Sequence, residues 1–129
     1  MGRSGFSAAV LIGVLWGFWH LPVIDFLGTA SPHGSYLLSY FIAFIAVMTA
    51  IMRILIAWLY ANTSSIFLTQ LMHISTTGSL VALSPIALTA RQEAIWYGVY
   101  AGILWGVVAL VVIKDGIRLK HAEMGDIST

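Results

Sequence analysis

Four segments of the chain are nearly free of charged side chains, and each is close to the length of about 20 residues that a helix needs to cross a bilayer. A helix satisfies its backbone hydrogen bonds within the hydrocarbon core, whereas an open sheet edge does not. We therefore predict an all-α fold, a polytopic membrane bundle of about four transmembrane helices. The predicted spans are Phe6 to Val23, Tyr36 to Tyr60, Ser65 to Leu83 and Ile95 to Ile113.

The composition excludes several classes of protein. Of the 129 residues 60% are hydrophobic and 9% are charged, whereas about 25% of a soluble domain is charged. The net charge of +1 and the scattered cations argue against binding of nucleic acid. Because the chain has no cysteine, its chemistry must come from histidines, carboxylates or hydroxyls.

The chain is predicted to have one transmembrane domain, residues 1–113, followed by a polar cytoplasmic tail, residues 114–129. Short cytoplasmic loops collect Lys and Arg, and with both termini in the cytoplasm only Arg91 of the six cations lies outside. We thus expect a multi-pass protein of a bacterial or archaeal plasma membrane. Arg53, inside the second span, is expected to snorkel toward the surface and not to pair in the interior.

Two histidines fall inside predicted spans, His20 near the end of the first and His73 near the middle of the third. Ionisable groups at membrane depth need a compensating partner and are functional hypotheses. Trp16 precedes His20 by four residues, so the two rings share a helix face, and Pro22 ends the helix soon afterwards.

The surroundings of His73 are unusually polar for a helix that faces lipid. Gln70, His73 and Thr77 share one face at spacings of three and four, and that face is predicted to point into the protein. It could hold a water molecule and supply hydroxyl donors to an oxyanion. The structural alternative is a polar seam between helices.

The segments LWGFWHLPV, Leu15 to Val23, and WLYANTSSIFLTQLMHISTTGS, Trp58 to Ser79, resemble the CPBP intramembrane proteases, the CAAX-processing and bacteriocin-processing family. The likeness covers roughly Leu11 to Ser84. Relatives share Glu-Glu-x-x-x-Arg, then Phe-x-x-x-His, then His-x-x-x-Asn. Trp16 stands at the phenylalanine of the second motif, and Thr77 at the asparagine of the third.

The resemblance implies catalytic roles for His20, His73 and Thr77. It also implies that His20 and His73 position a water molecule, directly or through Zn²⁺ or another divalent metal, for attack on a peptide bond. The implied substrate is a membrane-embedded peptide or a prenylated protein within the lipid bilayer.

The sequence contains no Glu-Glu-x-x-x-Arg motif. We therefore expect a truncated endopeptidase of the CAAX prenyl protease type, weakly active or inactive as this chain. The alternatives are a non-catalytic membrane protein, such as a transporter subunit or an assembly partner, and a carrier of metal or protons that uses the histidines as a relay.

Other polar and aromatic residues are predicted to have structural roles. His33 and His121 are expected to be solvated. Asp25, five residues after His20, is a candidate substitute carboxylate, although Pro22 breaks the helical register between them. Residues expected to anchor the membrane interfaces are Trp58, Tyr60, Trp96 and Tyr97.

Glycines recur every four residues in two predicted spans, and such seams favour close helix packing. They are Gly13 and Gly17 in the first span and Gly98, Gly102 and Gly106 in the fourth. The second set is also a candidate surface for a homo-oligomer.

Overall fold

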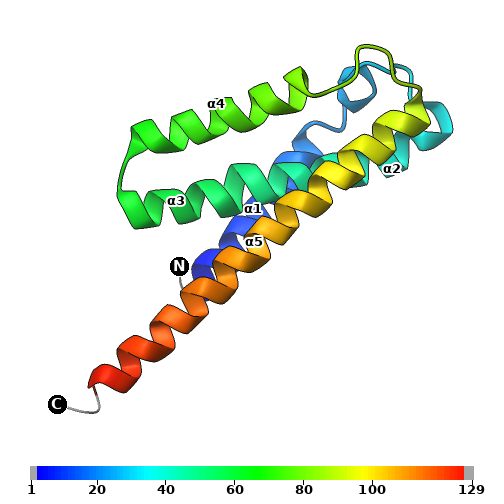
Figure 1. The fold of residues 1–129 in the computed structure, drawn as a ribbon. Helices are drawn as coiled ribbons and strands as arrows, with labels where there is room; N and C mark the ends of the chain where they lie inside the picture. Colours follow the sequence, from blue (N-terminus) through cyan, green and yellow to red (C-terminus); the bar gives the residue numbers. More distant parts are fainter. Residues whose placement is uncertain (1–2, 127–129) are drawn as a thin grey trace.

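The computed structural model describes the backbone of residues 3–126 and, apart from residues 3–5, 52, 81 and 116–126, their side chains. This part of the chain is all-α, as predicted (Figure 1). The longer elements are α1 (Arg3–Trp19), α2 (Leu37–Met48), η3 (Thr49–Leu55), α3 (Ile56–Thr63), α4 (Ile66–Ala82) and α5 (Ala90–Asp126). Two short 3₁₀ helices, η1 (Ile24–Phe26) and η2 (Gly34–Tyr36), lie between α1 and α2.

The centre of the fold is one long helical rod formed by α2, η3 and α3. The junction residues Thr49 and Ile56 keep helical dihedral angles, so the rod continues through η3, which is a π-helix. Tyr40, Val47 and Ala50 on this rod are fully buried. Helix α5 packs along α2, α1 packs against η3 and α2, and α4 packs mainly against α3 (Figure 1). The rod therefore carries the contacts that position the other helices.

Two helices of the described chain are long and apolar enough to cross a membrane, Gly34–Thr63 and Ala90–Asp115. The apolar part of α1, Phe6–Trp19, is shorter. Helix α4 has 17 residues, which include Gln70, His73 and five hydroxyl side chains. The total of four spans stays a prediction.

The two glycine seams differ in what they contact. A Cβ on Gly13 would collide with the backbone of Thr49, and one on Gly17 with the side chain of Ile45, so the close approach of α1 to the rod requires glycine there. No atom lies within 4 Å of a Cβ placed on Gly98, Gly102 or Gly106.

The prediction of close packing is thus confirmed for α1 and wrong within this chain for α5. The reason is that α5 packs through its other face, whose buried residues are Ala94, Tyr97, Ala101, Leu104 and Val108. A homo-oligomer formed through the α5 glycines stays a prediction.

Helix ends follow local sequence signals. Helix α1 ends at Trp19, three residues before Pro22, so it stops just before His20, whereas the sequence predicts an end soon after the histidine. Helix α5 begins at Ala90, five residues earlier than the predicted span. Thr89 caps it, because the Gln92 side chain accepts from the Thr89 N–H at 2.9 Å while the Gln92 N–H donates to the Thr89 hydroxyl at 3.3 Å.

Helix α5 also continues beyond Ile113 to Asp126, through most of the predicted tail. The side chain of His121 lies outside the described residues. The first turn of α1 and the last turns of α5 lie toward the same end of the molecule (Figure 1). This agrees with termini on one side of the membrane, and the side itself stays a prediction.

Candidate active site

A cavity of about 620 Å³ lies between the end of α1, the central rod and α4. Its volume falls in the range of about 300–1,000 Å³ that is typical of small-ligand sites. His20, His73 and Thr77, the three residues that the resemblance singled out, all line it. The lining is completed by Trp16, Leu27, Gly28, Phe44, Met48, Ile51, Arg53, Ile56, Thr76, Leu80 and Tyr97.

His20 is held at the end of α1 by backbone and aromatic contacts. Its Nδ1 lies 2.8 Å from the backbone carbonyl oxygen of Trp16. Because a carbonyl oxygen only accepts, Nδ1 must carry the proton, which leaves the Nε2 lone pair of the neutral ring free. The rings of Trp16 and Phe44 contact the imidazole edge-on, at centroid distances of 5.9 and 5.2 Å. These contacts prepare His20 to act as a base through Nε2.

His73 and Thr77 reach the cavity from α4, one helical turn apart, and both side chains are exposed. The neighbouring Thr76 hydroxyl donates to the carbonyl of Met72 at 2.8 Å, so it is occupied within the helix. Gln70 is exposed and does not line the cavity, contrary to the predicted polar face. It shares the direction of Thr77 but lies seven residues, or about 10 Å, farther along the helix.

Arg53 is partly exposed and contacts Trp16 of α1, and its snorkelling toward the surface stays a prediction. Its guanidinium carbon lies 5.1 Å from the centroid of the Trp16 ring, and its Nε is buried without a hydrogen-bond partner. A cation–π contact contributes about 0.5–2 kcal/mol, whereas a cation at the centre of a transmembrane helix costs about 2.5–3.5 kcal/mol on insertion scales. The Trp16 ring would therefore offset only part of the cost of a cation at the centre of a membrane span.

The described donors do not complete a catalytic metal site. Among the described residues no group of three or more His, Cys, Asp or Glu side chains is placed to hold a metal ion. The cavity brings together two imidazoles, His20 and His73, and a catalytic zinc usually has three protein ligands. The chemistry proposed below therefore rests on imidazoles and hydroxyls.

A second polar cluster, Asp25, His33 and Glu93, lies beside the cavity. The His33 ring lies between the two carboxylates, with Nδ1 3.0 Å from Asp25 Oδ1 and Nε2 3.1 Å from Glu93 Oε2. Both nitrogens donate in the imidazolium form, which matches two acceptor-only carboxylates. The ring also stacks on Tyr40 at a centroid distance of 4.0 Å.

This cluster corrects one prediction and decides against one alternative. His33 is 1% exposed and therefore not solvated. Asp25 pairs with His33 and is not among the residues that line the cavity with His20, so it is not the substitute carboxylate. Hydrogen bonds from the His33 backbone N–H and, second, from its ring hold the pKa of Asp25 below its ordinary value of 3.8.

Glu93 connects the cluster to the cavity wall. Its carboxylate accepts the backbone N–H groups of Thr29 at 2.8 Å and Ala30 at 2.9 Å, in addition to the His33 ring. Gly28, which lines the cavity, has a φ of 95°, and a Cβ there would collide with the Glu93 carboxylate. The first turn of α5 thereby fixes the loop that closes one end of the cavity.

Tyr97 belongs to this wall and is not an interfacial anchor. It is 9% exposed, and its ring packs edge-on against Tyr40 at a centroid distance of 4.8 Å. The expectation was wrong because α5 begins at Ala90, which places Tyr97 two turns inside the helix.

Comparison with known proteins identifies a family. The model of the type II CAAX prenyl endopeptidase Rce1-like family matches residues 1–79, a stretch that contains both cavity histidines and Thr77. No curated protein and no solved structure matches the chain. The match covers more than half of the chain, and the apolar helices are those of a membrane protein. The chain therefore belongs to the type II CAAX prenyl endopeptidase Rce1-like family.

Proposed function

We propose that this chain provides the histidine part of an intramembrane endopeptidase site that acts on the C-terminal peptide of prenylated proteins. The observation that carries the proposal is that His20 and His73, 53 positions apart in the sequence, line one cavity together with Thr77. Membership of the family supports the choice of substrate class. The largely apolar lining suits a substrate that enters from lipid.

The proposed reaction is addition of water to a peptide bond. His20 accepts a proton from the water through Nε2, because its Nδ1–H is held by the Trp16 carbonyl. The water oxygen attacks the peptide carbonyl, whose oxygen becomes an oxyanion that the Thr77 hydroxyl or the His73 ring N–H stabilises. The C–N bond then breaks, and the proton held on His20 passes to the leaving amine.

The roles of the two histidines differ in this scheme. His20 suits the proton transfer from water, because the Trp16 carbonyl fixes its tautomer and leaves Nε2 as the acceptor. His73 is exposed to the cavity from α4, and none of the hydrogen bonds described for α4 engages its ring, which leaves it available to the substrate. None of the residues that line the cavity is Asp or Glu. We therefore expect this chain to bind the substrate but to cleave it slowly.

The test is to fill the cavity at Thr77. We expect Thr77→Trp, in the full chain in lipid nanodiscs, to raise the Kd of a fluorescent farnesylated Cys-aliphatic-aliphatic-X peptide by about tenfold or more. The physical reason is that the indole occupies the space between His20 and His73. The matched control is Ser75→Trp, two residues away on α4, because Ser75 is exposed and does not line the cavity. Equal affinities of the two variants would contradict the proposal.

A further inference from the structure

Arg53 is a cation within the candidate membrane span Gly34–Thr63, and among the described residues no Asp or Glu lines the cavities that it borders. Its side chain lines the cavity of the histidines and also a second cavity of about 390 Å³ between α1, α3 and α4. No residue that lines either cavity is Asp or Glu. Its Nε is buried and lacks a hydrogen-bond partner. The residue as a whole is partly exposed to the two cavities, and a cation within an apolar helix favours an anion that the described residues do not supply.

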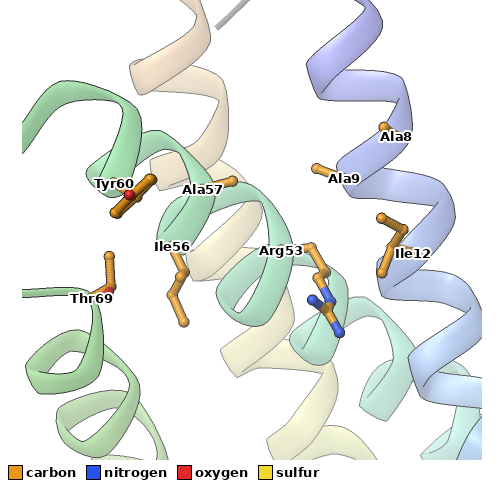
Figure 2. A pocket seen from close by; sticks show the side chains of 8 residues that line it. All are labelled: Ala8, Ala9, Ile12, Arg53, Ile56, Ala57, Tyr60 and Thr69. Atoms are coloured by element: carbon orange, nitrogen blue, oxygen red, sulfur yellow. The ribbon is translucent and has the colours of Figure 1, made fainter. Parts of the chain in front are cut away.

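The close-up of the second cavity shows how Arg53 is placed (Figure 2). Its side chain leaves η3 and extends between the helix that carries Ile56 and the face of α1 that carries Ala9 and Ile12 (Figure 2). Ile56, like Arg53, lines both cavities. Arg53 therefore lies where the two cavities meet, within the same space as His20 and His73.

We propose that the Arg53 guanidinium binds the C-terminal carboxylate of the peptide substrate. This inference rests on the proposed function. The planar guanidinium pairs with a carboxylate through two parallel hydrogen bonds. Its central carbon lies over the Trp16 ring, 5.1 Å from the ring centroid, and this contact uses none of its N–H donors in a hydrogen bond. A prenylated Cys-aliphatic-aliphatic-X substrate ends in such a carboxylate. Three extended residues span about 10 Å, which is the scale of a cavity of about 620 Å³.

The geometry gives Arg53 the role of a specificity residue. The carboxylate on Arg53 places the terminal residues inside the cavity and presents the peptide bond before them to His20 and His73. An amidated peptide, or one extended at its C-terminus, lacks the charge at this point. The side chain of the last residue, X, lies near the small side chains of the second cavity, among them Ala9 and Ala57.

The experiment measures binding, so it does not depend on cleavage. The probes are a farnesylated Cys-aliphatic-aliphatic-X peptide with a free C-terminal carboxylate and the same peptide with a C-terminal amide, titrated against the full chain in nanodiscs of uncharged lipid. We expect wild type to bind the acid about tenfold to a hundredfold more tightly than the amide. Arg53→Gln should lose this preference and bind the amide as wild type does, which shows that its fold is intact.

Two further variants sharpen the result. Arg91→Gln removes an exposed arginine from α5 and should keep the full preference. Arg53→Lys keeps the charge but not the fork, and an intermediate preference is expected. Equal binding of acid and amide by wild type, or a preference that Arg53→Gln retains, would overturn this inference alone. Failure of wild type to bind either peptide would overturn the proposed function and this inference with it.

Discussion

Replacing Glu93 with alanine is expected to lower the free energy of unfolding by about 3–5 kcal/mol, the usual cost of removing one partner from a buried ion pair. Glu93 is 1% exposed and accepts from the His33 ring and from the backbone N–H groups of Thr29 and Ala30. Alanine leaves the buried His33 ring with one partner, Asp25, and removes the acceptor of two backbone N–H groups. The measurement is unfolding in mixed micelles, followed by circular dichroism.

The matched control is Arg91→Ala, two residues away in the first turn of α5, because Arg91 is exposed. Its effect should stay within about 0.5 kcal/mol, the usual range of a surface substitution. Glu93→Gln keeps an acceptor for the loop and should cost less than alanine. A Glu93→Ala variant as stable as Arg91→Ala would show that the cluster does not hold the loop at Gly28.

The rate at which this chain releases the C-terminal tripeptide is expected to exceed the rate of the His20→Ala/His73→Ala double variant by no more than about tenfold. General acid–base catalysis contributes about 10²–10⁴-fold to a rate, and we expect this chain to fall short of that range because its base is incomplete. The sequence lacks the Glu-Glu-x-x-x-Arg motif, and the cavity is lined by imidazoles and hydroxyls without a carboxylate. The measurement is chromatography of the products formed from a farnesylated peptide in nanodiscs.

The outcome separates binding from catalysis. Turnover well above the double variant that is lost in His73→Ala would contradict this prediction and would show that the imidazoles suffice as the base. Binding without turnover would support the account, because the proposed substrate contacts come from Thr77, Arg53 and the cavity wall, all of which line the cavity. The two experiments use the same peptide, so they can be compared directly.

Periodicity predicted the parts of the site that lie on regular helices. A spacing of four placed Trp16 beside His20, and a spacing of four placed His73 with Thr77, and these residues line one cavity. Pro22 predicted that α1 ends close to His20, although the helix ends at Trp19, before the histidine and not after it. Local rules suffice in these cases because each depends on neighbours within a turn or two of helix.

The sequence did not predict features that depend on tertiary contacts. His33 and Glu93 are 60 residues apart, and in the sequence each is one polar residue of a loop. The glycine repeats of α1 and α5 are indistinguishable as sequence patterns. The rod packs against the repeat of α1, whereas none of the described residues packs against the repeat of α5. The direction of Arg53 depends on the position of Trp16 across the helix pair, which no local signal encodes. A Thr-x-x-Gln capping signal at Thr89 could have placed the start of α5.

The most direct test of the central claim is whether positions 20 and 73 face one another across the cavity. The chain has no cysteine, so the variant His20→Cys/His73→Cys carries two thiols and no others. A short bis-methanethiosulfonate crosslinker, applied to the full chain in nanodiscs, is expected to join the two positions, as detected by mass spectrometry of the linked peptides. The control is His20→Cys/Ile74→Cys, since Ile74 is exposed and does not line the cavity. Crosslinking at 20 and 73 but not at 20 and 74 is the predicted result; no crosslink at 20 and 73, or equal yields in the two variants, would contradict it.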